Sequence, residues 1–203
     1  MKPKSLLLCI VSLSAALFLC GSRAWGFNEP EDFKGVKWGA SRAETKKIIQ
    51  SQWDEQGLKP AGYSQMFKIT DTLPLGGLGG HATVSFEDNI GAAKNVLFIM
   101  HFIDDQFSAV ELSFYAVFYS AIEGAFVARY GQPDSTVVGE VQNRAGAKFA
   151  NPTSTWRGKI LTASTTKYFS TMTHGLATLG RVEYWKLKAD ELDKKYRAGA
   201  KDL

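Results

Sequence analysis

The alternation of apolar and polar residues along the chain predicts a fold rich in antiparallel strands. Apolar residues alternate with polar ones in 82–87, and two longer runs, 95–103 and 107–114, flank Asp104-Asp105. Short acidic residues tolerate left-handed backbone, so this pair is typical of a tight hairpin turn. Further strands are expected at 63–70, 135–142, 153–157, 159–168 and 176–186.

The central hairpin also predicts a bulge. If Asp104-Asp105 is a two-residue turn, Phe102 lies opposite Phe107. Strict alternation then turns the apolar residues of the second strand away from the face that Phe98 and Met100 share. One extra residue near Ser108-Ala109 restores them to that face, and we therefore expect a β-bulge there.

Two main helices are predicted by apolar residues at helical spacing. The first begins with a capping box, Ser41-Arg42-Ala43-Glu44, and ends near Gly57. The second spans about 115–130, is apolar over a wide face, and ends before Gly131. A short polar helix is expected at 189–198.

These elements predict an α+β domain. We expect a twisted antiparallel sheet with the two main helices packed on one face and the short polar helix at the C-terminus. The order of one helix followed by several strands occurs twice, which indicates a possible diverged duplication.

The first residues of the chain indicate export. Lys2 and Lys4 precede an apolar stretch of fourteen residues, Leu6–Leu19. This stretch is shorter than the roughly 20 residues that span a bilayer, but it suits a signal peptide. We expect cleavage before Phe27, or before Trp25 as second choice.

The expected domain organisation follows from that cleavage. Residues 1–26 are predicted to be a signal peptide, and 27–203 a single domain, which is periplasmic or secreted. A lipid anchor at Cys20 is the alternative, although Leu19 before it is large for a lipoprotein signal. We expect no transmembrane span after the signal is removed.

Removal of the signal changes what composition implies. The chain has 24 basic and 20 acidic residues, and three basic residues lie in the signal, so the mature chain is nearly neutral. The calculated pI near 9.0 therefore does not indicate nucleic-acid binding. Both cysteines, Cys9 and Cys20, also lie in the signal, which leaves the mature chain without a disulfide, a thiol nucleophile or a thiolate ligand.

No residue pattern indicates an enzyme or a cofactor site. The run Gly76–Gly80 lacks the lysine and hydroxyl residue of a phosphate-binding loop, and no Gly-x-Ser-x-Gly motif occurs. His81 and His101 lie on consecutive strands and face each other directly if their hairpin is centred at Gly91. Because no third ligand accompanies them, we expect surface or half-buried structural histidines, and no catalytic, cofactor or metal residue.

A set of sparse positions resembles a known group of proteins. They are Phe33-x-Gly35-x-x-Trp38-Gly39-x-Ser41-x-x-Glu44, Phe107-x-x-Val110-x-Leu112-x-Phe114, Tyr130-Gly131-x-Pro133 and Trp156. The chain resembles small exported proteins and lipoproteins of unknown function from Gram-negative bacteria. In outline it is similar to outer-membrane assembly lipoproteins of the BamE type and to β-lactamase inhibitor proteins. The resemblance implies helices laid on an antiparallel sheet, and it implies no activity.

An apolar stripe on the central strand is the candidate partner surface. Leu97, Ile99 and Ile103 lie on the face opposite Phe98, where the neighbouring strands are polar. We expect a non-catalytic interaction or envelope-accessory module that binds an unknown envelope protein or a second copy of the chain. The alternative is a small-molecule or lipid-binding protein with an aromatic-lined cleft between helix and sheet. We expect no nucleic-acid partner.

Overall fold

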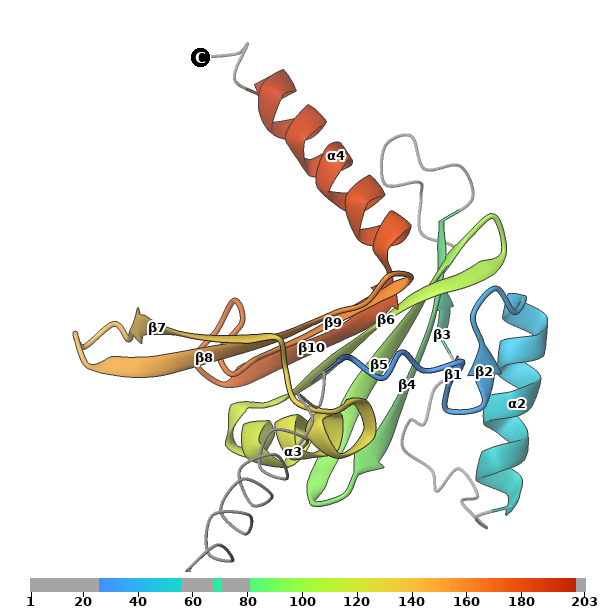
Figure 1. Ribbon diagram of the computed structural model, residues 1–203, viewed down its shortest axis with the longest axis horizontal. Helices are drawn as coiled ribbons and strands as arrows, with labels where there is room; N and C mark the ends of the chain where they lie inside the picture. Colours follow the sequence, from blue (N-terminus) through green and yellow to red (C-terminus); the bar gives the residue numbers. More distant parts are fainter. Residues whose placement is uncertain (1–25, 56–67, 71–80, 200–203) are drawn as a thin grey trace, which may run out of the picture.

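An eight-stranded antiparallel sheet forms the centre of the computed structural model, which describes residues 26–55, 68–70 and 81–199 (Figure 1). The expected α+β class with an antiparallel sheet is thereby confirmed. The expected signal cleavage sites before Phe27 and Trp25 are not tested, and Gly57, Gly76–Gly80 and Cys20 lie outside the described residues. Among the described residues, no helix combines the length and apolar character that a membrane crossing requires.

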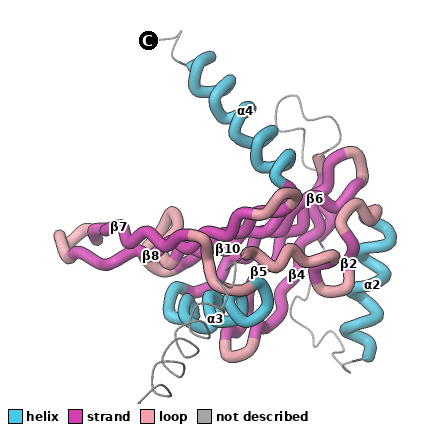
Figure 2. The backbone as a smooth tube through the Cα atoms, in the orientation of Figure 1, coloured by secondary structure: helices cyan, strands magenta, loops and turns pink. Residues whose placement is uncertain are grey.

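The sheet consists of two four-stranded halves. In the order in which they lie side by side, the strands are β3 (Lys68–Thr70), β4 (Ala82–Ile90), β5 (Ala93–Ile103), β6 (Gln106–Tyr115), β10 (His174–Arg181), β9 (Leu161–Thr166), β8 (Lys148–Arg157) and β7 (Ser135–Gln142). Within each half, neighbours along the chain pair with each other, and β10 pairs with β6 to join the halves. Figure 2 shows β7 and β8 extending away from the other strands as an arm.

Three α-helices accompany the sheet in the part of the chain that the structure describes. They are α2 (Arg42–Glu55), α3 (Tyr119–Tyr130), which follows a short 3₁₀ turn at Ala116–Phe118, and α4 (Val182–Gly199). A small hairpin of β1 (Asp32–Phe33) and β2 (Val36–Lys37) precedes α2. Each of α2 and α3 is followed by four strands, and a common origin of the two halves stays a prediction.

The predicted bulge between β5 and β6 is confirmed. Asp104 and Asp105 form the turn with positive φ values of 49° and 62°. Phe102 lies opposite Phe107 while His101 lies opposite Ala109, so Ser108 is the extra residue. The bulge returns the apolar residues of β6 to the core face, where they are buried beside Phe98 and Met100.

The predicted start of the first main helix and the predicted end of the second are also correct, whereas the second begins at Tyr119 and not near 115. The Ser41 hydroxyl accepts a hydrogen bond from the Glu44 amide at 3.2 Å, and α2 begins at the next residue, Arg42. At the end of α3, Gly131 has a φ of 88°, a conformation that favours glycine.

The C-terminal prediction was right about a strand followed by a helix but wrong about where the helix begins. The expected strand 176–186 ends at Arg181, and a helix of 18 residues begins at Val182 instead of the short helix expected at 189–198. Apolar and polar residues alternate here as in a strand, but Tyr184 and Lys188 are also four residues apart and share one helix face. Tyr184 on that face packs against His81 and His101, a tertiary contact that the local pattern does not indicate.

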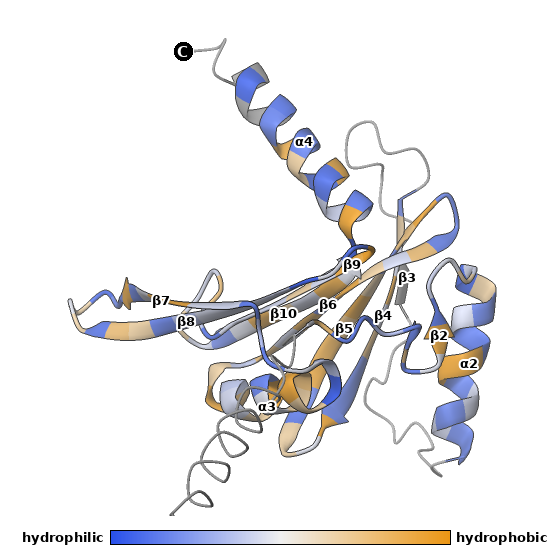
Figure 3. Cartoon of the chain, viewed as in Figure 1, coloured by the Kyte–Doolittle hydropathy of each residue, from blue (hydrophilic) through white to orange (hydrophobic). Residues whose placement is uncertain are grey.

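Aromatic side chains link the helices to the core. The Trp53 ring of α2 lies 5.8 Å from the Phe86 ring of β4, measured between centroids. The Phe126 ring of α3 lies 5.7 Å from the Trp156 ring of β8. Figure 3 shows hydrophobic residues concentrated on β4, β5, β6 and α3, whereas α4 is mainly hydrophilic along its outer half.

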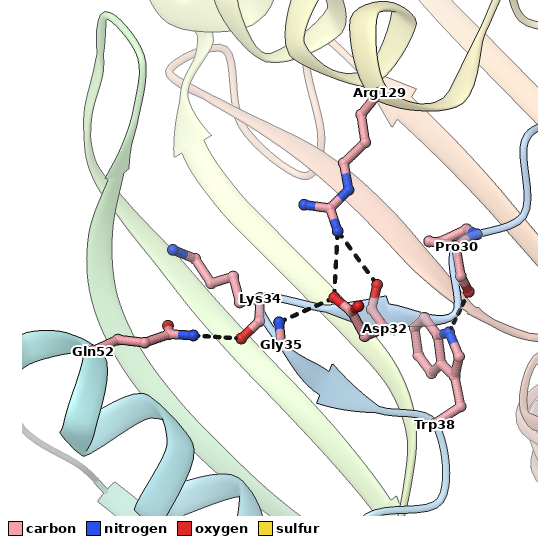
Figure 4. A network of polar contacts seen from close by, with 7 residues as sticks. All are labelled: Pro30, Asp32, Lys34, Gly35, Trp38, Gln52 and Arg129. Carbon is pink, nitrogen blue, oxygen red and sulfur yellow. Dashed lines mark hydrogen bonds and ion pairs between the residues drawn. The ribbon is translucent and has the colours of Figure 1, made fainter.

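The segment before α2 ties α2 to α3 (Figure 4). The Asp32 carboxylate accepts a hydrogen bond from the Gly35 amide at 3.0 Å and lies 3.4 Å from Nη2 of Arg129 on α3. The Lys34 carbonyl accepts a hydrogen bond from the Gln52 amide group of α2 at 2.8 Å. The Trp38 indole donates to the Pro30 carbonyl at 2.8 Å, which closes the segment on itself.

The approach of β10 to β6 depends on a glycine. A Cβ atom added at Gly180 would lie 2.4 Å from the Ala109 Cβ and 2.9 Å from its Cα. We expect Gly180→Ala to lower the free energy of unfolding by about 1–3 kcal/mol, since backbone has to move to relieve the overlap. Urea unfolding measures this loss. The matched Gly139→Ala variant, whose Cβ would meet the nearest atom at 3.7 Å, should be neutral or slightly stabilising. Equal effects of the two variants would contradict this account.

Candidate functional site

The face of the sheet opposite α3, here called the open face, is polar over much of its area. It carries threonine and serine pairs such as Ser164 and Thr178, whose hydroxyl oxygens lie 2.9 Å apart. The beginning of α4 lies on this face, where the Trp185 indole approaches Gly180, and the rest of α4 projects away from the sheet (Figure 1).

The structure places the predicted stripe of Leu97, Ile99 and Ile103 on the open face and shows all three residues half-buried. Ile99 lies between Ser85 and Glu111 on the neighbouring strands. Ile103 borders a cavity of about 190 Å³ whose other walls include residues of α4. The beginning of α4 therefore limits the stripe at its Ile103 end.

His81 and His101 meet on the same face, beneath α4. The expectation that they face each other directly was wrong by two residues. The turn is centred between Gly91 and Ala92 rather than at Gly91, and a register shift of one residue beside the turn then places Thr83 opposite His101. The two rings still come together diagonally, with His81 Nε2 3.2 Å from His101 Nδ1. The expected exposure was also wrong, since the residues are only 6% and 7% exposed.

Glu111 connects this histidine pair to α4. Its carboxylate forms an ion pair with Lys188 and lies 3.6 Å from His101 Nε2. Burial alone would raise the pKa of Glu111, but His101 and Lys188 outweigh burial and hold it at about 2. Tyr184 of α4, 2% exposed, lies against both histidines, with ring centroids 6.4 and 5.4 Å away. This cluster fixes the beginning of α4 on the open face.

The cluster does not supply a complete metal site from the described residues. No group of three or more histidine, cysteine, aspartate or glutamate side chains there is placed to hold a metal ion. The contact between the two imidazoles is consistent with an N–H···N hydrogen bond, in which one ring donates and the other accepts.

The outer edge of the sheet is a feature that sequence analysis missed. Strand β7 was predicted with its correct bounds. Its position at the edge of the sheet follows from the order in which the strands pair, which the sequence pattern does not indicate. Within the described part of the chain, β7 pairs with β8 alone. Val137 and Val138 point to opposite faces and are 66% and 65% exposed, so each face of β7 carries an exposed apolar side chain.

The hydrogen-bond pattern shows which groups of β7 point outward. The Asn143 amide donates to the Ala147 carbonyl at 3.0 Å, so odd-numbered residues of β7 direct their amides and carbonyls toward β8. Pro152, opposite Val138, agrees with this alternation because its carbonyl accepts from Lys167, on the side away from β7. The amides and carbonyls of Thr136, Val138 and Glu140 therefore point away from the sheet.

A cleft of about 610 Å³ opens at the end of β6, between the beginning of α3 and the connection from β9 to β10. Its walls include Tyr115, Phe118 and Tyr168 as well as two lysines, Lys94 and Lys167. The predicted aromatic-lined cleft was expected between helix and sheet. A smaller cavity of about 260 Å³ does lie there, bounded by Phe98 and residues of α3.

The histidine cluster predicts a pH dependence of stability. Burial lowers the pKa of His81, and the positive charges of His101 and Lys188 lower it further, against the opposing effect of Glu191 and Glu111. Below about pH 6.5 the unfolded chain therefore binds more protons at this residue than the folded chain. The stability contributed by neutral His81 is present above that pH and is lost as the pH falls.

We expect the free energy of unfolding to decrease between pH 7.5 and 5.0, as measured by urea unfolding. The ordinary pKa values of carboxyl groups lie below this window, so depressed carboxyl pKa values contribute little within it. His81→Gln keeps a polar side chain but does not titrate, and it should show a smaller decrease. A decrease of full size in His81→Gln would assign the effect to other groups.

No family model, no curated protein and no solved structure matches this chain. The resemblance to BamE-type lipoproteins and β-lactamase inhibitor proteins therefore stays an expectation, and function has to be inferred from the geometry of the chain itself.

Proposed function

We propose that the protein is an exported, non-catalytic interaction module whose working surface is the free edge of β7. The observation that supports this most directly is an eight-residue edge strand with outward-pointing amides and carbonyls and exposed valines on both faces. Such an edge accepts a further strand, and main-chain hydrogen bonds then provide affinity while exposed side chains provide specificity.

The edge lacks the features by which proteins usually prevent strand addition. Edge strands are commonly short, bulged, or interrupted by lysine or proline. Residues 135–142 contain neither lysine nor proline, and their register with β8 runs without a shift. The charge of Glu140 is balanced by Lys148 of β8 at 2.8 Å. By contrast, β3 at the other edge has three described residues.

The partner that fits this edge is the β7 strand of a second copy, antiparallel across a two-fold axis. Pairing centred at Val138 places Thr136 opposite Glu140 of the other copy, so the two glutamates do not face each other. The outward-pointing groups then form three facing pairs, or about six hydrogen bonds. Both exposed valines gain neighbours in the extended sheet.

On this proposal the other surfaces of the sheet have separate roles. We infer that α2 and α3 cover one face as a diverged pair, while the beginning of α4 fixes part of the open face. Because α4 reaches Ile103, the stripe of Leu97, Ile99 and Ile103 is the smaller candidate surface. Periplasmic location, as expected from the signal peptide, would bring the free edge to envelope proteins.

Val138→Pro tests the proposal. Proline removes the outward-pointing amide and blocks an added strand, but it spares the bonds to β8, as expected for proline on an edge strand. We expect sedimentation velocity to show concentration-dependent dimers of the mature wild-type chain and monomers of Val138→Pro, with little change in melting temperature. The control Val138→Thr keeps the amide and the strand preference and should still dimerise.

Ile99→Lys separates the two candidate surfaces in the same measurement. Dimerisation that survives Ile99→Lys and is lost in Val138→Pro assigns the contact to the edge. The reverse result would move the contact to the stripe and refute the edge proposal. A wild-type chain that stays monomeric at all concentrations would also refute pairing between copies.

A further inference from the structure

The cleft at the end of β6 combines positive charge with an apolar wall. Lys94 lies on β5, Lys167 follows β9, and both residues line the cleft. None of the residues that line it is acidic, and neither lysine forms an ion pair with a described residue. The lining therefore has two lysines without a carboxylate partner among the described residues, and the Lys167 ammonium group lies 5.2 Å from the centroid of the Tyr168 ring.

Apolar and aromatic side chains form much of the remaining surface. Phe118 and Met172 contribute apolar contact, and Tyr115 and Tyr168 present rings with polar hydroxyl groups. Met172 is unbranched and adapts to ligands of different shape. A volume of about 610 Å³ lies within the range of sites for small molecules.

Hydrogen bonds hold the walls in place without a ligand. The side chain of Asn151 bonds the Tyr168 backbone twice, accepting from its amide at 2.9 Å and donating to its carbonyl at 3.1 Å. The Ala116 amide donates to the Thr173 carbonyl at 2.8 Å, which joins the end of β6 to the opposite wall. A preformed site avoids the entropy cost of ordering its walls on binding.

We propose that this cleft binds a small amphipathic anion, with a carboxylate or phosphate group held by Lys94 and Lys167 and an apolar tail or ring against Phe118 and Met172. Lysine ammonium groups bind both kinds of headgroup as point charges. The site lies at a different place from the β7 edge, so this inference goes beyond the proposed function.

The test uses 8-anilinonaphthalene-1-sulfonate, an aromatic anion whose fluorescence increases in apolar sites, titrated with the mature chain. We expect binding that saturates at one molecule per chain and weakens about tenfold in the Lys94→Gln/Lys167→Gln variant, which corresponds to about 1.4 kcal/mol. Lys37 is exposed on β2 and does not line the cleft, so the control variant Lys37→Gln should bind the probe like the wild type.

Displacement then identifies the headgroup. Octanoate that displaces the probe supports a carboxylate ligand, and octyl phosphate that does so supports a phosphate ligand. Displacement by neither, unchanged affinity in the double variant, or an equal loss in Lys37→Gln would overturn the proposal. Sedimentation of the double variant should match the wild type, so a failure here is distinct from a failure of edge pairing.

Discussion

The pairing of β10 with β6 is the constraint on which the rest of the structure depends. Each half of the sheet is a meander of four strands. Seven residues of β10 pair with seven residues of β6, and this pairing joins the two meanders into one sheet. Because the second meander joins through its last strand, its first strand, β7, necessarily lies at the outer edge. The same join places the end of β10 beside the beginning of β6, where α4 begins. The pairing of β10 with β6 therefore accounts both for the free edge of β7 and for the part of the open face that α4 covers.

Local features of the fold could be predicted because they depend on neighbouring residues. The Asp104-Asp105 turn determines the register of its hairpin, and the apolar residues of β6 then require the bulge at Ser108. The Ser41 cap and the stop at Gly131 are equally local. In each case the residues that predict the turn, cap or bulge lie in the same short segment as the structure that they produce.

Features that depend on distant pairing could not be predicted. The turn centred between Gly91 and Ala92 and the one-residue register shift beside it together displace the histidines by two residues, and nothing in the alternation of β4 and β5 indicates either. The expected strand continued past Arg181 because apolar residues continue to Leu187, and the burial of Tyr184 against the sheet is a tertiary contact that the local pattern does not indicate. The edge position of β7 needs the strand order of the whole sheet. The candidate surfaces therefore emerged from the three-dimensional arrangement, although the strand residues themselves were predicted.

Pro152 affects the stiffness of the arm formed by β7 and β8. It lies just outside the strand pairing of β8 with β9, which begins at Thr153, and Pro152 and Asn151 are the last residues of β8 that bond the segment after β9. Beyond this proline the sheet narrows to a ribbon of two strands, and such ribbons are marginally stable and strongly twisted. A strand added to β7 would widen the ribbon at its weakest part. Amide hydrogen exchange in residues 139–151 would then slow on assembly, and the arm would become rigid when its partner binds.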